Sequence, residues 1–522
     1  MITDSMLMRH ALSLACLSLL LELPPARLAS GAEPPAANPS KPTTGSEEKK
    51  KEASDPGKAP VVTEHRSRIG TLDIEYRATT GFLPIKDNGG QVTAKMFYIA
   101  YTRSGQNSAK RPLTFSFNGG PGSSSVWMHM GLLGPKRVKL RDDGFALPPP
   151  YELVDNTESL LDETDLVFID PVSTGLSRAT KPEEAKKFHG VQEDARSVAE
   201  FIRLYLTRND RWPSPKFLIG ESYGTTRAAA LSRELLQQHR LNLNGIMLVS
   251  TVLNFQTIWG GSGNDLPHVL YLPSFCATAW YHQKLEPALQ KLPLKEVLAQ
   301  AEAFAAGPYQ QALLMGHALP ETQFKTIASQ VARFCGLSSE FVAANNLRIS
   351  LNRFSTELLR DQRLVCGRFD SRYTNFTRDP LSPFAESDPS ADAIFSAYAS
   401  TFHHYLRETL RFEDDEPYHI LGNVGPWNWD AENEYADLSE ALAATMNANP
   451  FLRVHVSSGF FDLATPYFAS RYTMNHLRLH PKLMANITMD DYQAGHMMYL
   501  NLPDLKKQKA DLARFIQQAS AR

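Results

Sequence analysis

The chain has 522 residues, of which 43% are hydrophobic and 21% are charged, and its formal net charge is −2. This composition is that of an ordinary globular protein, long enough for one large domain or two to three smaller ones. The near-neutral charge and the lack of a basic stripe interleaved with aromatic residues exclude nucleic acid as an expected partner. No C-x-x-C or H-E-x-x-H spacing is present, so we expect no metal and no other cofactor.

The first 32 residues have the pattern of a secretory signal peptide. Arg9 and His10 precede an apolar run, Ala11–Leu21, and small residues follow up to Ala32, after which cleavage is expected. The run is too short to span a bilayer, and no later stretch reaches about 18 apolar residues, so we expect no membrane span. A lipid on Cys16 and a disordered N-terminus are the two alternatives. The prediction is an exported protein, periplasmic or extracellular.

Residues 33–60 are dominated by Pro, Ala, Ser, Gly and charged residues. Such a segment buries too little apolar surface to offset the entropy of ordering, which predicts a flexible linker. Three cysteines lie beyond it: Cys276, Cys335 and Cys366. Because an odd number permits at most one internal disulfide, we expect the core to be held by apolar burial rather than by disulfides.

The segment 61–253 alternates strand and helix patterns. Strand-like runs occupy Leu72–Ala78, Gln91–Arg103, Pro112–Phe117, Leu166–Ile169, Phe217–Ile219 and Gly245–Ser250. Helical spacing covers Glu193–Thr207 and the Ala- and Leu-rich stretch after Gly224. Strands that alternate with helices predict a mainly parallel sheet covered on both faces, as in the α/β-hydrolase fold.

The rest of the chain is organised around Gly220-Glu221-Ser222-Tyr223-Gly224, which links a strand-like run to a helix. In the pattern G-x-S-x-G, the glycines allow a strand-to-helix turn so tight that the serine hydroxyl is exposed above the sheet. The helix N-terminus also directs N–H groups at an oxyanion formed there. A structural Gly-Ser turn is the alternative. The context favours Ser222 as a nucleophile and the N–H of Tyr223 as an oxyanion donor.

The strand Pro112–Phe117 ends in a glycine-rich turn, Asn118–Ser125. Three glycines directly after a strand allow backbone N–H groups to come close to a ligand. In the α/β-hydrolase fold, a loop at this place supplies the second oxyanion donor. We therefore expect the N–H of Gly120 to join that of Tyr223, and an ordinary turn is the alternative.

Between about 254 and 430 helical patterns dominate, which suggests a helical insertion that caps the carboxyl edge of the sheet. Its helical runs are Leu294–Ala306, Glu321–Phe334, Leu347–Leu359 and Ala391–Leu410. The strand and helix pattern of the core returns over 431–522. Its elements are two strands and a terminal amphipathic helix: Leu452–Ser458, Asn486–Met489 and Asp504–Ala519.

Ser222, Asp462 and His496 follow the chain order of nucleophile, acid and base in the α/β-hydrolase fold. Asp462 lies just beyond a strand, and His496 lies in the loop after the last strand. Ser222 would attack a carbonyl, His496 would take and return its proton, and Asp462 would orient the imidazole. Asp170 also follows a strand, but it precedes Ser222 in the chain. We interpret it as a loop-shaping residue.

Four blocks of the chain resemble the signature motifs of the serine carboxypeptidases, the carboxypeptidase Y-like family. The blocks are Asn118–Ser125, Gly220–Gly224, Gly459–Asp462 and Ala494–Met497. The resemblance runs from about Arg66 to the C-terminus and suggests a bacterial-type member.

This resemblance implies the removal of C-terminal residues from peptides, with Ser222, Asp462 and His496 as the triad. It also implies that Asn118 and Glu221 bind the terminal carboxylate of the substrate. Because Glu221 and that carboxylate are like charges, they must share a proton, and binding should weaken as the pH rises.

Two positions depart from the family pattern. Ser123 stands where the family usually has a cysteine, so that family disulfide is not expected. Leu132 stands where a second glutamate near Glu221 is common, so Glu221 experiences one like charge fewer. We therefore expect a pH optimum nearer to neutrality than is usual for the family.

Two other functions fit the same residues. An esterase or acyltransferase would use the same triad, because fold and triad do not fix the acyl donor. A non-catalytic binding protein would keep the fold alone. Asn118 and Glu221 favour the peptidase, because an ester substrate has no free carboxylate to bind. Trp127, Met128 and Tyr223 are candidates for the lining of substrate pockets, and burial in the core is the alternative for these large apolar side chains.

Overall fold

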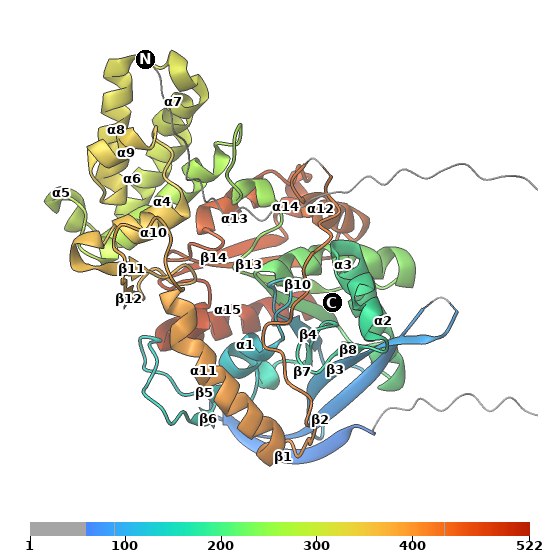
Figure 1. Ribbon diagram of the computed structural model, residues 1–522. Coiled ribbons are helices and arrows are strands. Elements are labelled where there is room, and N and C mark those ends of the chain that lie inside the picture. The colour runs from blue at the N-terminus through green and yellow to red at the C-terminus, as the bar shows by residue number, and fades with distance from the viewer. Residues whose placement is uncertain (1–58, 88, 433, 522) are drawn as a thin grey trace, which may run out of the picture. The chain divides into compact units, whose positions relative to one another are not determined.

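The computed structural model describes residues 59–87, 89–432 and 434–521 (Figure 1). The predicted signal peptide, Cys16 and the predicted linker up to residue 58 lie outside the described residues. Across the described chain, every helix falls short of the length or the apolar character that a membrane span requires.

Ten strands form one sheet in the order β1-β2-β3-β7-β4-β9-β10-β13-β14, and β8 pairs with β3. The strands are β1 (Val61–Ile69), β2 (Leu72–Lys86), β3 (Val92–Arg103), β4 (Leu113–Phe117), β7 (Asp165–Ile169), β8 (Arg178–Ala179), β9 (Lys216–Glu221), β10 (Gly245–Val249), β13 (Arg453–Gly459) and β14 (Ile487–Tyr492). The first three strands pair antiparallel, and from β7 to β14 every pairing is parallel. Two short ribbons lie apart: β5 (Lys136–Val138) with β6 (Leu153–Asp155), and β11 (Leu364–Cys366) with β12 (Thr374–Phe376).

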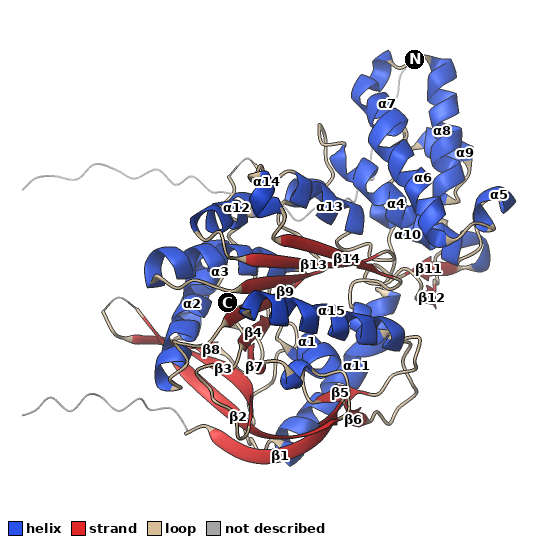
Figure 2. Ribbon diagram, turned by 180° about the vertical axis from the view of Figure 1, so that it is seen from behind, coloured by secondary structure: helices blue, strands red, loops and turns tan. Residues whose placement is uncertain are grey.

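Helices cover both faces of the sheet because its central strands are apolar on both sides. In β9, Leu218 packs into one core cluster, whereas its neighbours Phe217 and Ile219 pack into a second. Alternate side chains of a strand point to opposite faces, so a continuous apolar run requires cover on each. The covering helices are α2 (Val191–Arg208), α3 (Tyr223–His239) and α12 (Ser439–Ala448) in the first cluster, and α1 (Val126–Met128), α11 (Pro389–His404) and α15 (Leu502–Ser520) in the second (Figure 2). The predicted α/β-hydrolase fold is confirmed.

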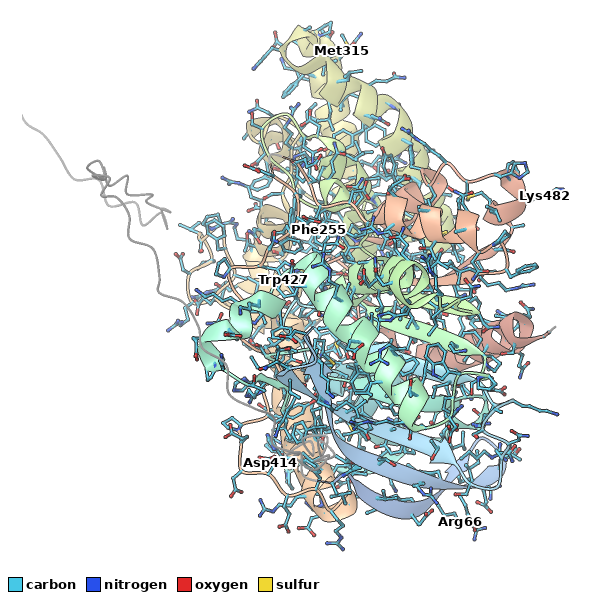
Figure 3. All side chains as sticks on the ribbon, turned by 90° about the vertical axis from the view of Figure 1, so that its right-hand side faces the viewer. Arg66, Phe255, Met315, Asp414, Trp427 and Lys482 are labelled. Carbon is cyan, nitrogen blue, oxygen red and sulfur yellow. The ribbon has the colours of Figure 1, made fainter. Side chains whose placement is uncertain are left out.

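A third apolar cluster joins the helices that follow β10 to the end of β13. These helices are α4 (Leu266–Tyr281), α5 (Pro287–Gln290), α6 (Leu294–Phe304), α7 (Gln310–Met315), α8 (Glu321–Cys335), α9 (Ser339–Ala344) and α10 (Leu351–Glu357), and they stand beside the sheet in Figure 1. Met315, labelled in Figure 3, marks their outer end. The thiols of Cys276, Cys335 and Cys366 are buried and free, so this part of the chain is held by packing.

Two more helices, α13 (Tyr467–Asn475) and α14 (Pro481–Met484), connect β13 to β14. α13 begins directly after Pro466, which is its N-cap residue. The turn between β13 and α13 carries Asp462. The predicted helix Ala391–Leu410 corresponds to α11 and one further turn, and α11 packs into the second core cluster rather than with α4 to α10.

An irregular segment, residues 411–432 and 434–438, crosses the carboxyl ends of the parallel strands and is called the strap below. It forms single bridges from Leu421 to Ser123 and from Asn428 to Gly190. Asp414 and Trp427 mark its course in Figure 3, and Trp427 packs with Phe255 in a separate apolar cluster. The strap therefore fastens together loops that follow different strands.

Candidate active site

Ser222 sits at the turn between β9 and α3 with φ of 60° and ψ of −130°. A positive φ is uncommon for a residue other than glycine and marks backbone strain. The flanking glycines are required by close approach: a Cβ at Gly220 would lie 2.1 Å from the Gly224 carbonyl oxygen, and one at Gly224 would lie 2.8 Å from the Phe117 carbonyl oxygen. The strand-to-helix turn predicted from the sequence is confirmed.

The glycine-rich turn after β4 lies directly against this elbow. A Cβ at Gly119 would lie 2.4 Å from the Tyr223 nitrogen and 2.7 Å from the Gly224 nitrogen. Gly120 has φ of 103°, which only glycine adopts readily. The two backbone segments predicted to supply oxyanion donors, at Gly120 and Tyr223, are therefore neighbours at the start of α3.

His496 and Asp462 form a buried pair, with His496 Nδ1 2.8 Å from Asp462 Oδ2. The other carboxylate oxygen, Oδ1, accepts the N–H groups of Ala464 at 2.7 Å and Thr465 at 2.9 Å. The Thr465 hydroxyl donates to Oδ2 at 2.8 Å. Burial by itself would lower the pKa of His496, but the adjacent Asp462 carboxylate and Glu221 outweigh it, so that pKa is raised above 6.5. The pair is suited to hold a proton on the imidazole.

Ser222 and His496 line one cavity of about 280 Å³. In the described chain no hydrogen bond joins their side chains. Hydrogen bonds between a catalytic nucleophile and its base are often long before substrate binds. The apolar wall of the cavity is formed by Trp127, Ile394, Phe395, Leu421 and Met497. Trp127 thus lines the cavity as predicted. Met128 and Tyr223 fit the alternative, burial in the core, because their side chains are buried in apolar clusters.

The loop that carries His496 is held by the segment between β11 and β12. The Phe369 carbonyl oxygen accepts the His496 N–H at 2.6 Å, and the two rings lie 5.2 Å apart. Asp370 Oδ2 accepts the Gly495 N–H at 3.0 Å, and Arg372 pairs with the same carboxylate at 2.6 Å. These residues could not be predicted from the sequence, because no motif marks a loop residue that acts through contacts with backbone.

Glu221, beside Ser222, is buried with both carboxyl oxygens occupied. Asn118 Nδ2 donates to Oε1 at 2.9 Å, and the Tyr499 hydroxyl donates to Oε2 at 2.6 Å. Burial raises the pKa of Glu221 to about 7, although His496, Tyr499 and Asn118 act in the opposite direction. The carboxyl is therefore poised to take or lose a proton near neutral pH. Tyr499 was not predicted from the sequence.

Asp170 lies apart from this group and shapes a loop, as interpreted from the chain order. Its Oδ1 accepts both the N–H and the hydroxyl of Ser125, each at 2.8 Å, and so fixes the end of the glycine-rich turn.

Leu132 is fully buried. Its neighbour Gly131 is pressed against Tyr499, since a Cβ there would lie 2.5 Å from a carbon of the Tyr499 ring.

The Asn118 backbone is held in turn by a buried ion pair. Arg227 on α3 and Asp194 on α2 lie 2.6 Å apart, and each is almost fully buried. Arg227 also donates to the Asn118 carbonyl oxygen, and its guanidinium lies 5.5 Å from the ring centre of Phe117. Two helices are thereby tied to the turn that carries Asn118 and Gly120.

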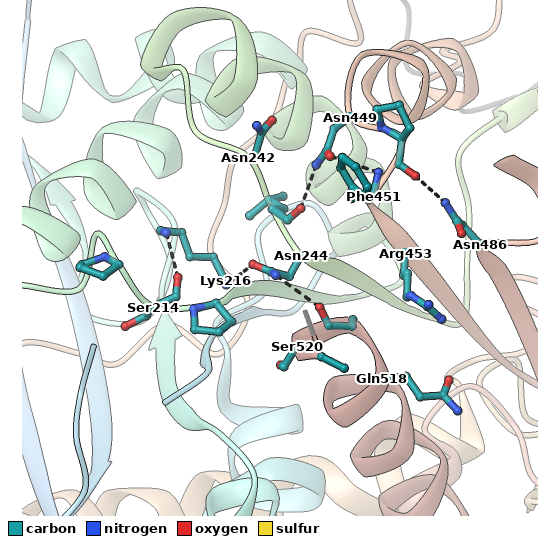
Figure 4. Close-up of a pocket in the computed structure, with 16 residues that line it drawn as sticks. Ser214, Lys216, Asn242, Asn244, Asn449, Phe451, Arg453, Asn486, Gln518 and Ser520 are labelled. Carbon is teal, nitrogen blue, oxygen red and sulfur yellow. Dashed lines mark hydrogen bonds between the residues drawn. The ribbon is translucent and has the colours of Figure 1, made fainter. Parts of the chain in front are cut away.

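A larger cavity, of about 610 Å³, lies at the amino-terminal ends of the parallel strands, where β9, β10 and β13 begin (Figure 4). Two of its asparagines are engaged with backbone: Asn449 donates to the Leu243 carbonyl oxygen and Asn486 to that of Pro450, both at 2.9 Å. These amides link strand starts to neighbouring loops. None of the predicted site residues lines this cavity, so the candidate active site is the smaller one.

The parallel sheet, the strained elbow at Ser222 and the adjacent Asp462–His496 pair together define the α/β-hydrolase class of proteins. The chain belongs to the serine carboxypeptidase family, whose sequence model matches residues 70–501.

Among individual proteins, the chain is similar to serine carboxypeptidase-like 36 and serine carboxypeptidase-like 45 of Arabidopsis thaliana. It is 26% identical to the first over 190 residues, or 35% of this chain and 36% of the relative, and 25% identical to the second over 208 residues, or 38% and 42%. The chain thus spans less than half the length of these relatives.

A solved structure, that of Kex1(delta)p, a prohormone-processing carboxypeptidase from Saccharomyces cerevisiae, has a TM-score of 0.50 and 15% identity. The alignment covers 85% of this chain and 91% of that one, and at this identity it supports the fold.

Proposed function

We propose that the protein is a serine carboxypeptidase that removes C-terminal residues from peptides through an acyl-enzyme. The observation that carries this proposal is the Asn118–Glu221 pair next to Ser222, because it provides a place for a terminal carboxylate beside the nucleophile. Peptides with a free C-terminus are the substrates, and membership of the serine carboxypeptidase family supports this assignment.

In the first step Ser222 Oγ attacks the carbonyl carbon of the last peptide bond, and His496 Nε2 takes the hydroxyl proton. Asp462 holds Nδ1–H and stabilises the imidazolium that forms. The N–H groups of Gly120 and Tyr223 bind the oxyanion, where a single donor contributes about 3 kcal/mol. The imidazolium then protonates the leaving amine, and water hydrolyses the acyl-enzyme by the same route.

The terminal carboxylate of the substrate binds between Asn118 and Glu221. Asn118 Nδ2 carries two N–H donors, so it can serve Glu221 and a second acceptor. Glu221 must be protonated to stand beside a second carboxylate, and its raised pKa of about 7 makes that form available up to neutral pH. Affinity for the free acid therefore falls as the pH rises above the pKa of Glu221, whereas His496 must lose its proton to act as a base.

A comparison of peptides with their C-terminal amides tests this assignment. We expect Asn118→Ala to lower kcat/KM for a free-acid peptide by about 10- to 100-fold. This factor corresponds to the free energy of one hydrogen bond to a charged group. The amide, already a poor substrate, should change little. Mass spectrometry of the shortened peptides measures both rates, and Asn423→Ala, in an exposed part of the strap, is the control.

Equal rates for acid and amide in the wild-type protein would contradict the carboxypeptidase assignment. Hydrolysis of simple esters without any shortening of peptides would establish the alternative, an esterase or acyltransferase that uses Ser222, His496 and Asp462.

The protein is exported, with residues 1–32 as the signal peptide and 33–60 as a linker. Residues 61–253 and 431–522 form the hydrolase core, and 254–430 are the insertion, in which α4 to α10 form the helical cap and α11 packs on the core. The apolar run Ala11–Leu21 supports export. We expect Glu33 at the N-terminus of the protein recovered from the periplasm or medium, as read by N-terminal sequencing. An uncleaved N-terminus on a protein confined to the cytosol would contradict export.

A further inference from the structure

The two partners of Glu221 differ in what they can do. The Asn118 side chain is fixed in orientation because its Oδ1 accepts the Met128 N–H at 3.2 Å, so its nitrogen faces Glu221 and can only donate. The Tyr499 hydroxyl, 2.6 Å from Glu221 Oε2, can either donate or accept by rotating its proton. Tyr499 is thus the partner that can donate to ionised Glu221 and accept from protonated Glu221.

Packing holds the Tyr499 ring in place. Tyr499 lies in the 3₁₀ turn Met498–Leu500, three residues after His496, and is 2% exposed. Its ring is pressed against Gly131, where a Cβ would lie 2.5 Å from ring carbon Cε2. Burial, with Glu221 close by, raises the pKa of Tyr499 well above 10. The phenol therefore stays neutral and remains a donor at every pH at which the protein would work.

Four titratable groups face Glu221 from three segments: His496 and Tyr499 from the connection after β14, Asp462 from the turn after β13, and Tyr398 from α11. Burial and Asp462 favour the protonated carboxyl, and His496 favours the ionised one. Donation by Tyr499 also favours the ionised form. The Tyr499 hydrogen bond therefore opposes burial directly at one oxygen of Glu221.

We propose that Tyr499 is a positioning residue that fixes the Glu221 carboxyl and sets the pH above which a peptide carboxylate no longer binds. The proposal rests on the proposed function, because it assigns Tyr499 a role in the binding of the terminal carboxylate. Without the hydroxyl, the ionised form of Glu221 loses a hydrogen-bond donor. The carboxyl therefore keeps its proton to a higher pH. Binding of the free acid then persists to a higher pH as well.

The test is the pH profile of kcat/KM for a free-acid peptide in the wild-type protein and in Tyr499→Phe. We expect the alkaline limb to move up by about one to two pH units, since a hydrogen bond to a charged group corresponds to a pKa shift of that size. On the alkaline side of the wild-type limb, the change should lie in KM rather than kcat. An alkaline limb that stays in place or moves to lower pH overturns the proposal.

Three comparisons separate this role from a general loss of structure. Tyr398→Phe removes a second buried phenol, one that faces Glu221 without a hydrogen bond to it in the described chain, and should leave the limb in place. Glu221→Gln cannot titrate and should abolish the limb. In that background Tyr499→Phe should have no further effect on the profile, and a shift there would show that Tyr499 acts through another group, which overturns the proposal.

The two proposals fail in different ways. If the wild-type protein does not distinguish a peptide acid from its amide, the carboxypeptidase assignment fails and the role of Tyr499 fails with it. If the wild-type protein prefers the acid and the limb of Tyr499→Phe coincides with that of the wild type, only the inference about Tyr499 is overturned.

Discussion

Replacing Ser222 with alanine is expected to lower kcat for peptide hydrolysis by about 10⁶-fold, the loss known for a serine nucleophile that works with a histidine base. The alanine removes the only atom that would bond to the substrate carbonyl, and it leaves the elbow otherwise unchanged. Since Ser222 is the residue at φ of 60°, alanine meets the same backbone strain as serine. Peptide shortening under single-turnover conditions measures the remaining rate.

Ser232, on the helix α3 that follows Ser222, provides a matched control. It is buried, and its hydroxyl donates to the Ala229 carbonyl oxygen, away from the candidate site. Ser232→Ala should keep kcat within about threefold of the wild type, because it touches none of the reacting groups. A Ser222→Ala protein that retains more than about one hundredth of the wild-type kcat would reject Ser222 as the nucleophile.

Replacing Asp462 with asparagine should lower kcat by about 10⁴-fold with little change in the fold, as for the corresponding change in a known triad. Two backbone N–H groups, from Ala464 and Thr465, point at Oδ1. They hold the amide oxygen of the asparagine at that position and direct its NH₂ group toward His496 Nδ1. The imidazole must then accept at Nδ1 and carry its proton on Nε2, where it cannot take the proton of Ser222.

Asp170→Asn is the matched control, because Asp170 is also a buried carboxylate at the end of a parallel strand. Its contacts are with Ser125 rather than with the histidine. We expect it to lower kcat by less than about tenfold, since it acts on loop geometry alone. Steady-state kinetics at a fixed pH compares the two variants. Equal losses in both would indicate that Asp462 acts only through the stability of its turn.

Strong apolar periodicity made the central elements predictable. β9 and β10 read as continuous apolar runs because both faces of these strands are covered, and helix α2 has a clear apolar stripe. β1 was missed because the edge strand exposes every second residue and carries charge along its length. The predicted strand Leu72–Ala78 continues to Lys86 in the structure, because its second half pairs with β3.

In the candidate site, the sequence predicted residues that belong to motifs or have a fixed chain order. Ser222, Asp462 and His496 follow recognisable strands, and the structure places Asp462 against His496. Tyr499 and Phe369 could not be predicted, because their importance arises from contacts between segments far apart in the chain. The choice between pocket lining and burial could not be made for Met128 from the sequence for a related reason: it belongs to a single helical turn that is buried on all sides.

The contacts of the Phe369–Asp370 segment with the histidine loop link the candidate active site to the folding of the insertion. The elbow at Ser222 is built from neighbouring strand and helix, but His496 is held by a segment that follows the helices α4 to α10. A chain whose insertion has not yet folded would therefore present a strained serine without a correctly placed imidazole. Hydrolytic competence would then depend on the folding of the insertion as well as of the elbow.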